Sequence, residues 1–392
     1  RQGQLQTSGL DLDSLLVSAD DTHMATDPTP LLPLLQGLPA VDLQIGLAEL
    51  TFATESLSDA SLRLQTQAGR VDIVDASFNS PYGAAQWQAS LVTRNGAADV
   101  QVDGSIQNLK LASFTQTQIK DLIDQPLGGS VSLQGRGKSW TELYLDTRLH
   151  LKLDAARQGS NLRPEVDIDV EVRALGENQW QADIADLYWR NSDVQGRVTF
   201  HNTQPPELRA DLTAGLLDLT QFEHTRAEAG SEASNSGLIR SVSNTTARAL
   251  NFLSNSVRST VGVKARATDS TSKRYFSAQP WSLAAMDAVD ADISIAAARV
   301  KSRRGEAHDV IFRGDVGGRQ LDMQMQSPQA NGGPLDFVLA YDATQQPALA
   351  RLSLSIEQVR LNPLPGVVPM SAFVDLSAQG NSERSLASSL TG

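Results

Sequence analysis

The chain has 392 residues and a formal net charge of −12. This acidic balance argues against a nucleic-acid partner, because phosphate binding draws on a basic surface. The absence of cysteine excludes disulfides and thiolate metal sites and leaves the redox compartment open. Hydrophobic residues make up 40% but aromatic residues only 5%, which favours a thin apolar layer of aliphatic side chains over a thick core.

Residues 1–144 are predicted to form a first stretch of β-sheet, with a short helix at about 116–124. The chain begins at Arg1, with no initiator Met, signal peptide or apolar run of bilayer-spanning length. We therefore expect a fragment whose membrane anchor, if it has one, lies upstream.

Residues 145–222 are predicted to continue the same sheet as an up-and-down meander, because short turn sequences separate segments of period-two alternation. The predicted inward-facing aliphatic residues of this meander are Leu149, Leu151, Leu153, Val166, Ile168, Val170 and Val172. The same alternation places Asp167, Asp169 and Glu171 on the opposite, solvated face, which favours a wet strand surface over a cation site.

Residues 223–275 are predicted to be a linker with an amphipathic basic helix at about 237–260. Its apolar stripe and positive charges are Leu238, Val242, Leu250, Leu253, Val257, Arg240, Arg248 and Arg258. Two interpretations stay open. The helix either packs as a lid over the sheet, which we favour, or lies on an anionic membrane surface.

Residues 276–392 are predicted to be a second copy of the first sheet. The segment from Arg70 to Phe114 aligns without a gap onto Gln320 to Leu364 at an offset of 250 residues, and the offset falls to 243 farther on. Upstream, Val41 aligns with Val289 at 248. Repeated units of this kind stack end to end. The prediction is that Leu109, Leu111, Val359 and Leu361 face the same side of the sheet.

No residue is predicted to be catalytic, cofactor-binding or metal-ligating. The segment Gly135 to Ser139 is similar to the end of a phosphate-binding loop, but Ser132 stands where that loop needs a glycine. A strand, and not a helix, is expected to follow Ser139. The five histidines show no metal-ligand spacing, and no nucleophile-elbow motif occurs.

Several short segments resemble the AsmA family. They are Phe276 to Ile293, with its Pro280-Trp281 turn before an aspartate-rich strand, and the closing stretch that holds Phe373-Val-Asp-Leu376, Gly380-Asn-Ser382 and Leu386 to Gly392. Variants of the same strand-to-turn step occur at Leu10 to Leu16 and Leu217 to Phe222. The resemblance covers nearly the whole chain, and it rests on the order and repetition of motifs made of common residues.

The resemblance implies a mostly β fold: a long twisted antiparallel sheet of repeated up-and-down strands, folded into a groove, with a few short helices. It also implies a non-enzymatic periplasmic protein tethered to the inner membrane, which transfers phospholipid or maintains the outer membrane. Phospholipid is the implied ligand, and the membrane surface and outer-membrane proteins are further candidate partners. The rival function is a scaffold that pairs its strand edges with outer-membrane proteins, and the weakest alternative is a hydrolase.

Overall fold

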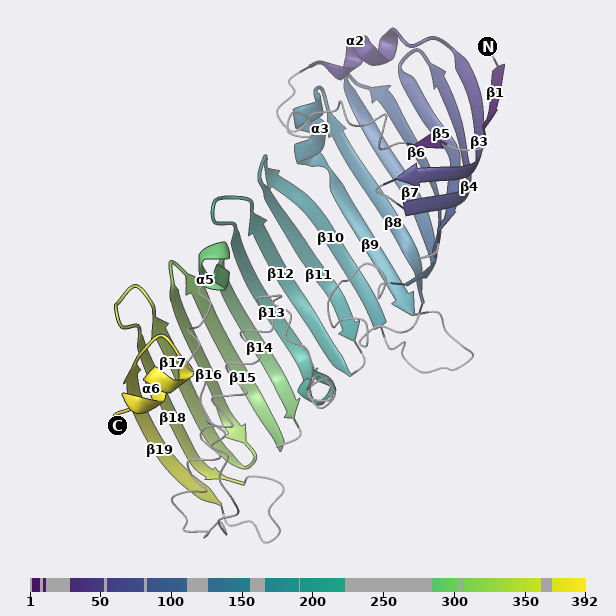
Figure 1. The fold of residues 1–392 in the computed structure, drawn as a ribbon. Coiled ribbons are helices and arrows are strands. Elements are labelled where there is room, and N and C mark those ends of the chain that lie inside the picture. Colours follow the sequence, from purple (N-terminus) through teal and green to yellow (C-terminus); the bar gives the residue numbers. More distant parts are fainter. Residues whose placement is uncertain are drawn as a thin grey trace, which may run out of the picture. The chain divides into compact units, whose positions relative to one another are not determined.

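The computed structural model describes residues 2–7, 10–11, 29–52, 55–80, 83–110, 126–155, 166–189, 191–222, 284–302, 305–360 and 369–392. Figure 1 labels the helices and strands of the chain. The chain divides into two compact units. Unit 1 comprises Arg1–Thr203 and Arg209–Leu217, and unit 2 comprises Gln204–Leu208 and Asp218–Gly392. The predicted short helix at 116–124 and the whole predicted linker at 223–275, with its basic helix at 237–260, lie outside the described residues.

Unit 1 is a ladder of neighbouring antiparallel strands from β3 onward. Its strands are β3 (Val41–Phe52), β4 (Glu55–Gln67), β5 (Arg70–Ser80), β6 (Gly83–Arg94), β7 (Ala97–Leu109), β8 (Leu127–Gly137), β9 (Arg148–Ala155), β10 (Val166–Gly176), β11 (Gln179–Trp189), β12 (Ser192–His201) and β13 (Glu207–Asp218). Two short strands, β1 (Gln2–Thr7) and β2 (Leu10–Asp11), pair with β3 in parallel. Short turns join most neighbours, as expected for an up-and-down meander.

Unit 2 is a second antiparallel ladder. Its strands are β14 (Asp290–Ser302), β15 (Gly305–Gly317), β16 (Gln320–Ala330), β17 (Gly333–Asp342), β18 (Leu349–Val359) and β19 (Met370–Gln379). The helices are short: α2 (Leu31–Gln36) and α3 (Trp140–Asp146) in unit 1, and η4 (Leu219–Phe222), α5 (Ala284–Ala288) and α6 (Glu383–Ser388) in unit 2. The predicted fold class, mostly β and antiparallel with a few short helices, is confirmed.

The duplication extends to strand register. Leu43 pairs with Leu64 between β3 and β4, and 250 residues later Ile293 pairs with Gly314 between β14 and β15. The bulge after Ile106 in β7 recurs after Ile356 in β18. The offset of 248 predicted upstream is therefore wrong by two residues. A shift of two preserves which face each side chain occupies, so alternation alone did not reveal it.

A helix, and not the predicted strand, follows the Gly135 to Ser139 segment. Ser139 caps α3 by accepting a hydrogen bond from the Glu142 backbone N–H at 3.2 Å, and Glu142 accepts one from the Lys138 N–H at 2.9 Å. Leu145, predicted to open the next strand, lies in α3, and β9 begins at Arg148. A serine followed three residues later by glutamate is the capping-box pattern, and it was present in the sequence.

Candidate functional site

One face of the unit 1 sheet carries an unbroken row of aliphatic side chains, which we call the apolar row. Residues directly opposite each other on antiparallel strands project from the same face, so the strand register traces the row from strand to strand. Its members, one from each strand from β3 to β12, are Leu43, Leu64, Ile73, Ala89, Val102, Leu133, Leu149, Val172, Ala182 and Val198.

Every member of the apolar row is half-buried. Neighbouring strands cover the sides of each side chain, while part of its apolar surface stays accessible. An antiparallel sheet with one apolar face normally packs that face against another layer. A row of ten aliphatic residues, none of them fully buried, is therefore the distinctive chemical feature of unit 1.

The sequence-predicted lining residues fall on this same face. Leu149, Leu151 and Leu153 of β9 lie opposite Val172, Val170 and Ile168 of β10. Val166 and Leu109 join a cluster near the other end of these strands, together with the buried Leu127 and Leu153. Leu111, Leu361 and the eight predicted residues of the basic helix lie outside the described residues.

A small helix layer covers one end of the apolar face in unit 1. Leu31 and Leu35 of α2 pack with Leu143 of α3 over the strand residues, which are Val71, Leu91 and Val100. The Leu31 N–H donates to the Lys138 carbonyl at 2.9 Å, and the Gly69 N–H donates to the Leu35 carbonyl at 2.8 Å. These bonds fix α2 at the strand ends, where Figure 1 draws it.

Unit 2 repeats this arrangement within itself. A row of paired apolar residues runs through all six of its strands: Ile295, Phe312, Met325, Phe337, Leu354 and Val374. At one end Met286 of α5 packs against Leu321, Tyr341 and Ala350. These three residues stand 250 positions after Val71, Leu91 and Val100, so the helix-covered end is part of the duplicated unit. Val359, predicted as a lining residue, is buried at the opposite end, opposite Met370.

The opposite face of unit 1 is polar and carries ion pairs. Asp169 Oδ1 lies 2.6 Å from His150 Nε2, and Lys152 Nζ lies 3.7 Å from Asp169 Oδ2. The Arg197 guanidinium donates to Asp183 at 2.7 Å, and this hydrogen bond holds the pKa of Asp183 below its usual value. The three acids that were predicted to be wet thus lie opposite polar partners, since Asp167 and Glu171 pair in register with Asp154 and His150.

The polar faces of the two copies differ at Gln65 and its equivalent, Asp315. In unit 1 Gln65 and Arg63 both donate to Asp42, and the Arg63 hydrogen bond is the main cause of the lowered pKa of Asp42. In unit 2 Asp315 replaces Gln65, and its pKa is raised by desolvation and then by its neighbours Asp292, Asp322 and Asp290. The raised pKa means that this charge opposes folding of unit 2 once pH rises above the usual aspartate range.

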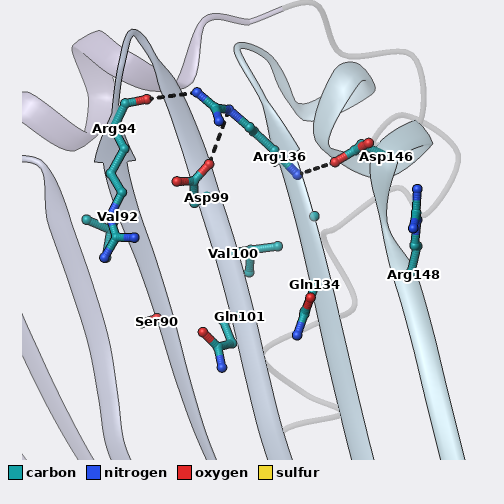
Figure 2. A pocket seen from close by; sticks show the side chains of 11 residues that line it. Ser90, Val92, Arg94, Asp99, Val100, Gln101, Gln134, Arg136, Asp146 and Arg148 are labelled. Carbon is teal, nitrogen blue, oxygen red and sulfur yellow. Dashed lines mark hydrogen bonds and ion pairs between the residues drawn. The ribbon is translucent and has the colours of Figure 1, made fainter.

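An open polar pocket of about 360 Å³ lies on the polar face of unit 1, near α3. Figure 2 shows Arg136 among the lining residues, joined by dashed lines to Arg94, Asp99 and Asp146. Its Nε lies 3.3 Å from Asp99 Oδ1, and its backbone N–H donates to Asp146 at 2.8 Å. A pocket of about 220 Å³ occurs at the equivalent place in unit 2. There Leu349 replaces Asp99 and Arg351 replaces Gln101, so the repeat preserves the hollow but not its chemistry. We therefore conclude that both pockets arise from the way the strands pack, and we assign no ligand to them.

Sequence reasoning named the apolar residues of β9 and β10 and Leu109 of β7, but it missed the members of the apolar row on β3 to β8. Leu43 and Leu64 show the same period-two alternation, and Leu133 follows from the repeat, so the signal was present. The alternation does not tell which residues of neighbouring strands lie opposite each other, and only that register shows that they form one row. Within the described ranges, no group of three His, Asp or Glu residues is placed to hold a metal ion.

The helices within the described ranges include none with the length and hydropathy to cross a membrane. Comparison of the chain with protein-family models, curated proteins and solved structures yields no match.

Proposed function

We propose that the apolar face binds the acyl chains of phospholipid and that the chain is a non-enzymatic periplasmic envelope protein of the AsmA type. The single observation that carries this proposal is the ten-strand row of half-buried aliphatic side chains in unit 1. The assignment to the periplasm, to inner-membrane tethering and to the AsmA family rests on the motif resemblance in the sequence.

The energetics favour an acyl ligand. Removing one methylene from water is worth about 0.8 kcal/mol, so an acyl chain of roughly 16 carbons gains on the order of 10 kcal/mol from an apolar environment. The ion pairs of His150 with Asp169 and of Arg197 with Asp183 lie on the opposite face, so an acyl chain on the apolar row leaves them in water. A ligand bound there replaces water over surface that unit 1 leaves accessible.

The length of the row also suits this ligand. Ten strands at a spacing of about 4.8 Å give a row on the order of 40 Å long. The acyl chains of one leaflet span half of the roughly 30 Å hydrocarbon thickness of a bilayer. The apolar row of unit 1 is thus long enough to hold more than one acyl chain end to end, which suits a surface along which lipid moves.

Native mass spectrometry of the purified chain tests this function. We expect bound phospholipid in protein purified without detergent, and uptake of phospholipid by protein that has been stripped of it and then mixed with vesicles. A polar, acyl-free headgroup analogue such as glycerophosphocholine is the matched control and should not bind. Repeated preparations without lipid, together with no uptake from vesicles, would contradict the proposal.

A further inference from the structure

The dipeptide Asn-Gly occurs twice in the chain, at Asn95-Gly96 and at Asn331-Gly332. Both pairs form hairpin turns, the first between β6 and β7 and the second between β16 and β17. In both turns the asparagine and the glycine have positive φ, with 49° and 76° in the first and 50° and 104° in the second. The two turns therefore hold the same dipeptide in a similar backbone conformation, as expected for short hairpin loops.

An asparagine that precedes glycine can convert without an enzyme. The glycine backbone nitrogen, once hydroxide has removed its proton, attacks the side-chain carbon Cγ of the asparagine. The bond from Cγ to the amide nitrogen breaks, ammonia leaves, and a five-membered succinimide ring results. Water then opens this ring at either of its two carbonyl carbons and leaves aspartate or isoaspartate. Glycine hinders the attack least because it has no Cβ, so the freedom of the asparagine amide decides the rate.

The side-chain amide of Asn95 is free to take part in this reaction. Asn95 and Gly96 are both exposed. No hydrogen bond joins the Asn95 amide to another residue within the described ranges. A Cβ placed on Gly96 would meet no atom within 4 Å, so the space around the attacking residue is open. The amide can therefore turn toward the Gly96 nitrogen without losing a contact.

The side-chain amide of Asn331 is held in place by the start of β15. Its Oδ1 accepts a hydrogen bond from the Glu306 backbone N–H at 2.7 Å. The same amide lies against Gly305, where an added Cβ would overlap it. The Asn331 backbone N–H also donates to the Glu306 carbonyl at 2.8 Å. The ring closes at Asn331 only after the amide leaves the Glu306 N–H, so the fold slows the reaction at this turn.

We propose that Asn95 is a site of spontaneous modification, where the folded chain gains a negative charge and, in part of the molecules, an isoaspartate. Isoaspartate adds one atom to the backbone of a two-residue turn that the pairing of Arg94 with Ala97 closes. The next residue, Ala98, is fully buried and packs with Leu31 of α2 in the helix layer. The isoaspartate form therefore loosens the helix-covered end of unit 1. This modification does not depend on lipid binding.

Peptide mapping by mass spectrometry tests the site after incubation of the folded full chain at mildly alkaline pH. Each conversion replaces an amide nitrogen by oxygen and so changes the mass of the peptide. We expect the Asn95 peptide to convert at least about fivefold faster than the Asn331 peptide, because one hydrogen bond of ordinary net strength changes a rate by about that factor. In the chain unfolded by urea the two peptides should convert at similar rates, because the fold no longer holds either amide.

The consequence for the turn is tested by hydrogen exchange. Protein with isoaspartate at position 95 should exchange the backbone amides at the ends of β6 and β7 faster than fresh protein. Fresh Asn95→Asp protein carries the same charge without the extra backbone atom and should exchange like the unmodified chain. Equal conversion at the two asparagines of the folded chain, or none at Asn95, overturns the proposed site. Unchanged exchange in the isoaspartate form overturns the proposed loosening.

Discussion

Val131→Asp is expected to weaken acyl-chain binding to unit 1 by at least about tenfold, because an unpaired carboxylate buried under an acyl chain costs several kcal/mol. Val131 lies on the apolar face, opposite Gly104 of β7 and Leu151 of β9. The measurement is titration of the full chain with a phospholipid that carries brominated acyl chains, read by quenching of tryptophan fluorescence. Four of the five tryptophans belong to unit 1, so the signal reports mainly on that unit.

The neighbouring residue provides the control for this substitution. Ser130 is exposed on the polar face of the same strand, opposite Lys152 of β9. Ser130→Asp introduces the same charge one position away and should leave binding within about twofold of the unmodified chain, because its carboxylate stays in water beside a cation. Equal losses in the two variants would show that charge anywhere on β8 disturbs binding, and the face-specific account would fail.

Gly129→Ala is expected to destabilise unit 1 by about 1–3 kcal/mol, the usual cost of forcing an extra carbon into a packed site. A Cβ at residue 129 would overlap the Lys152 carbonyl oxygen of β9 and lie 2.9 Å from the Leu153 Cα. Glycine at this position lets β8 and β9 approach closely where Leu127 and Leu153 form a buried cluster. Denaturant unfolding followed by tryptophan fluorescence measures the loss.

Gly128→Ala is the matched comparison for that loss. The nearest atoms to a Cβ at residue 128 are the Ile106 carbonyl oxygen at 3.6 Å and an Asp154 carboxylate oxygen at 3.9 Å, which are ordinary contacts. This variant should be neutral or more stable by about 0.4–1 kcal/mol, because alanine restricts the unfolded chain. A loss in Gly128→Ala as large as that in Gly129→Ala would refute the close-approach argument.

Most of the fold could be predicted from the alternation of apolar and polar side chains along the chain. Leu149, Leu151 and Leu153 were placed on the correct strand and on one face because period two is a local property of the backbone. The duplication was equally visible, since an ungapped alignment requires no knowledge of structure. Its upstream offset went wrong by two residues because Asp42 and Ile45 meet an aspartate and an isoleucine at either offset. Only the pairing of Leu43 with Leu64, matched by that of Ile293 with Gly314, selects 250.

Other features depended on contacts between distant residues. The half-buried state of Val102 and Leu133 follows from which strands and helices cover them, and no local pattern encodes that coverage. The parallel pairing of β1 and β2 with β3 joins segments about 40 residues apart and breaks the meander that the turns predict. Helix α3 could have been predicted from the sequence, because Ser139 and Glu142 form a helix-capping pattern. The prediction of a strand at this place did not take that pattern into account.

The site itself was only partly predictable. The sequence supplied aliphatic residues such as Val170 and Ile168 as candidates, but it did not say that neighbouring strands align them into one row. The proposed lipid site therefore rests on register, which the structure supplies and the sequence does not.

The central claim, that acyl chains lie on the apolar face, is tested most directly by a single tryptophan placed on either face of β6. Trp87 lies on the apolar face and is 41% exposed. It is opposite Gly104 of β7, which in turn is opposite Val131 of β8. Its neighbour Gln88 is exposed on the opposite face. One variant keeps Trp87 alone, with the other four tryptophans changed to Phe, and its partner adds Trp87→Phe and Gln88→Trp. The account predicts that brominated phospholipid quenches Trp87 strongly and leaves the tryptophan at position 88 nearly unchanged. Equal quenching at the two positions, or none at Trp87 while lipid is bound, would contradict it.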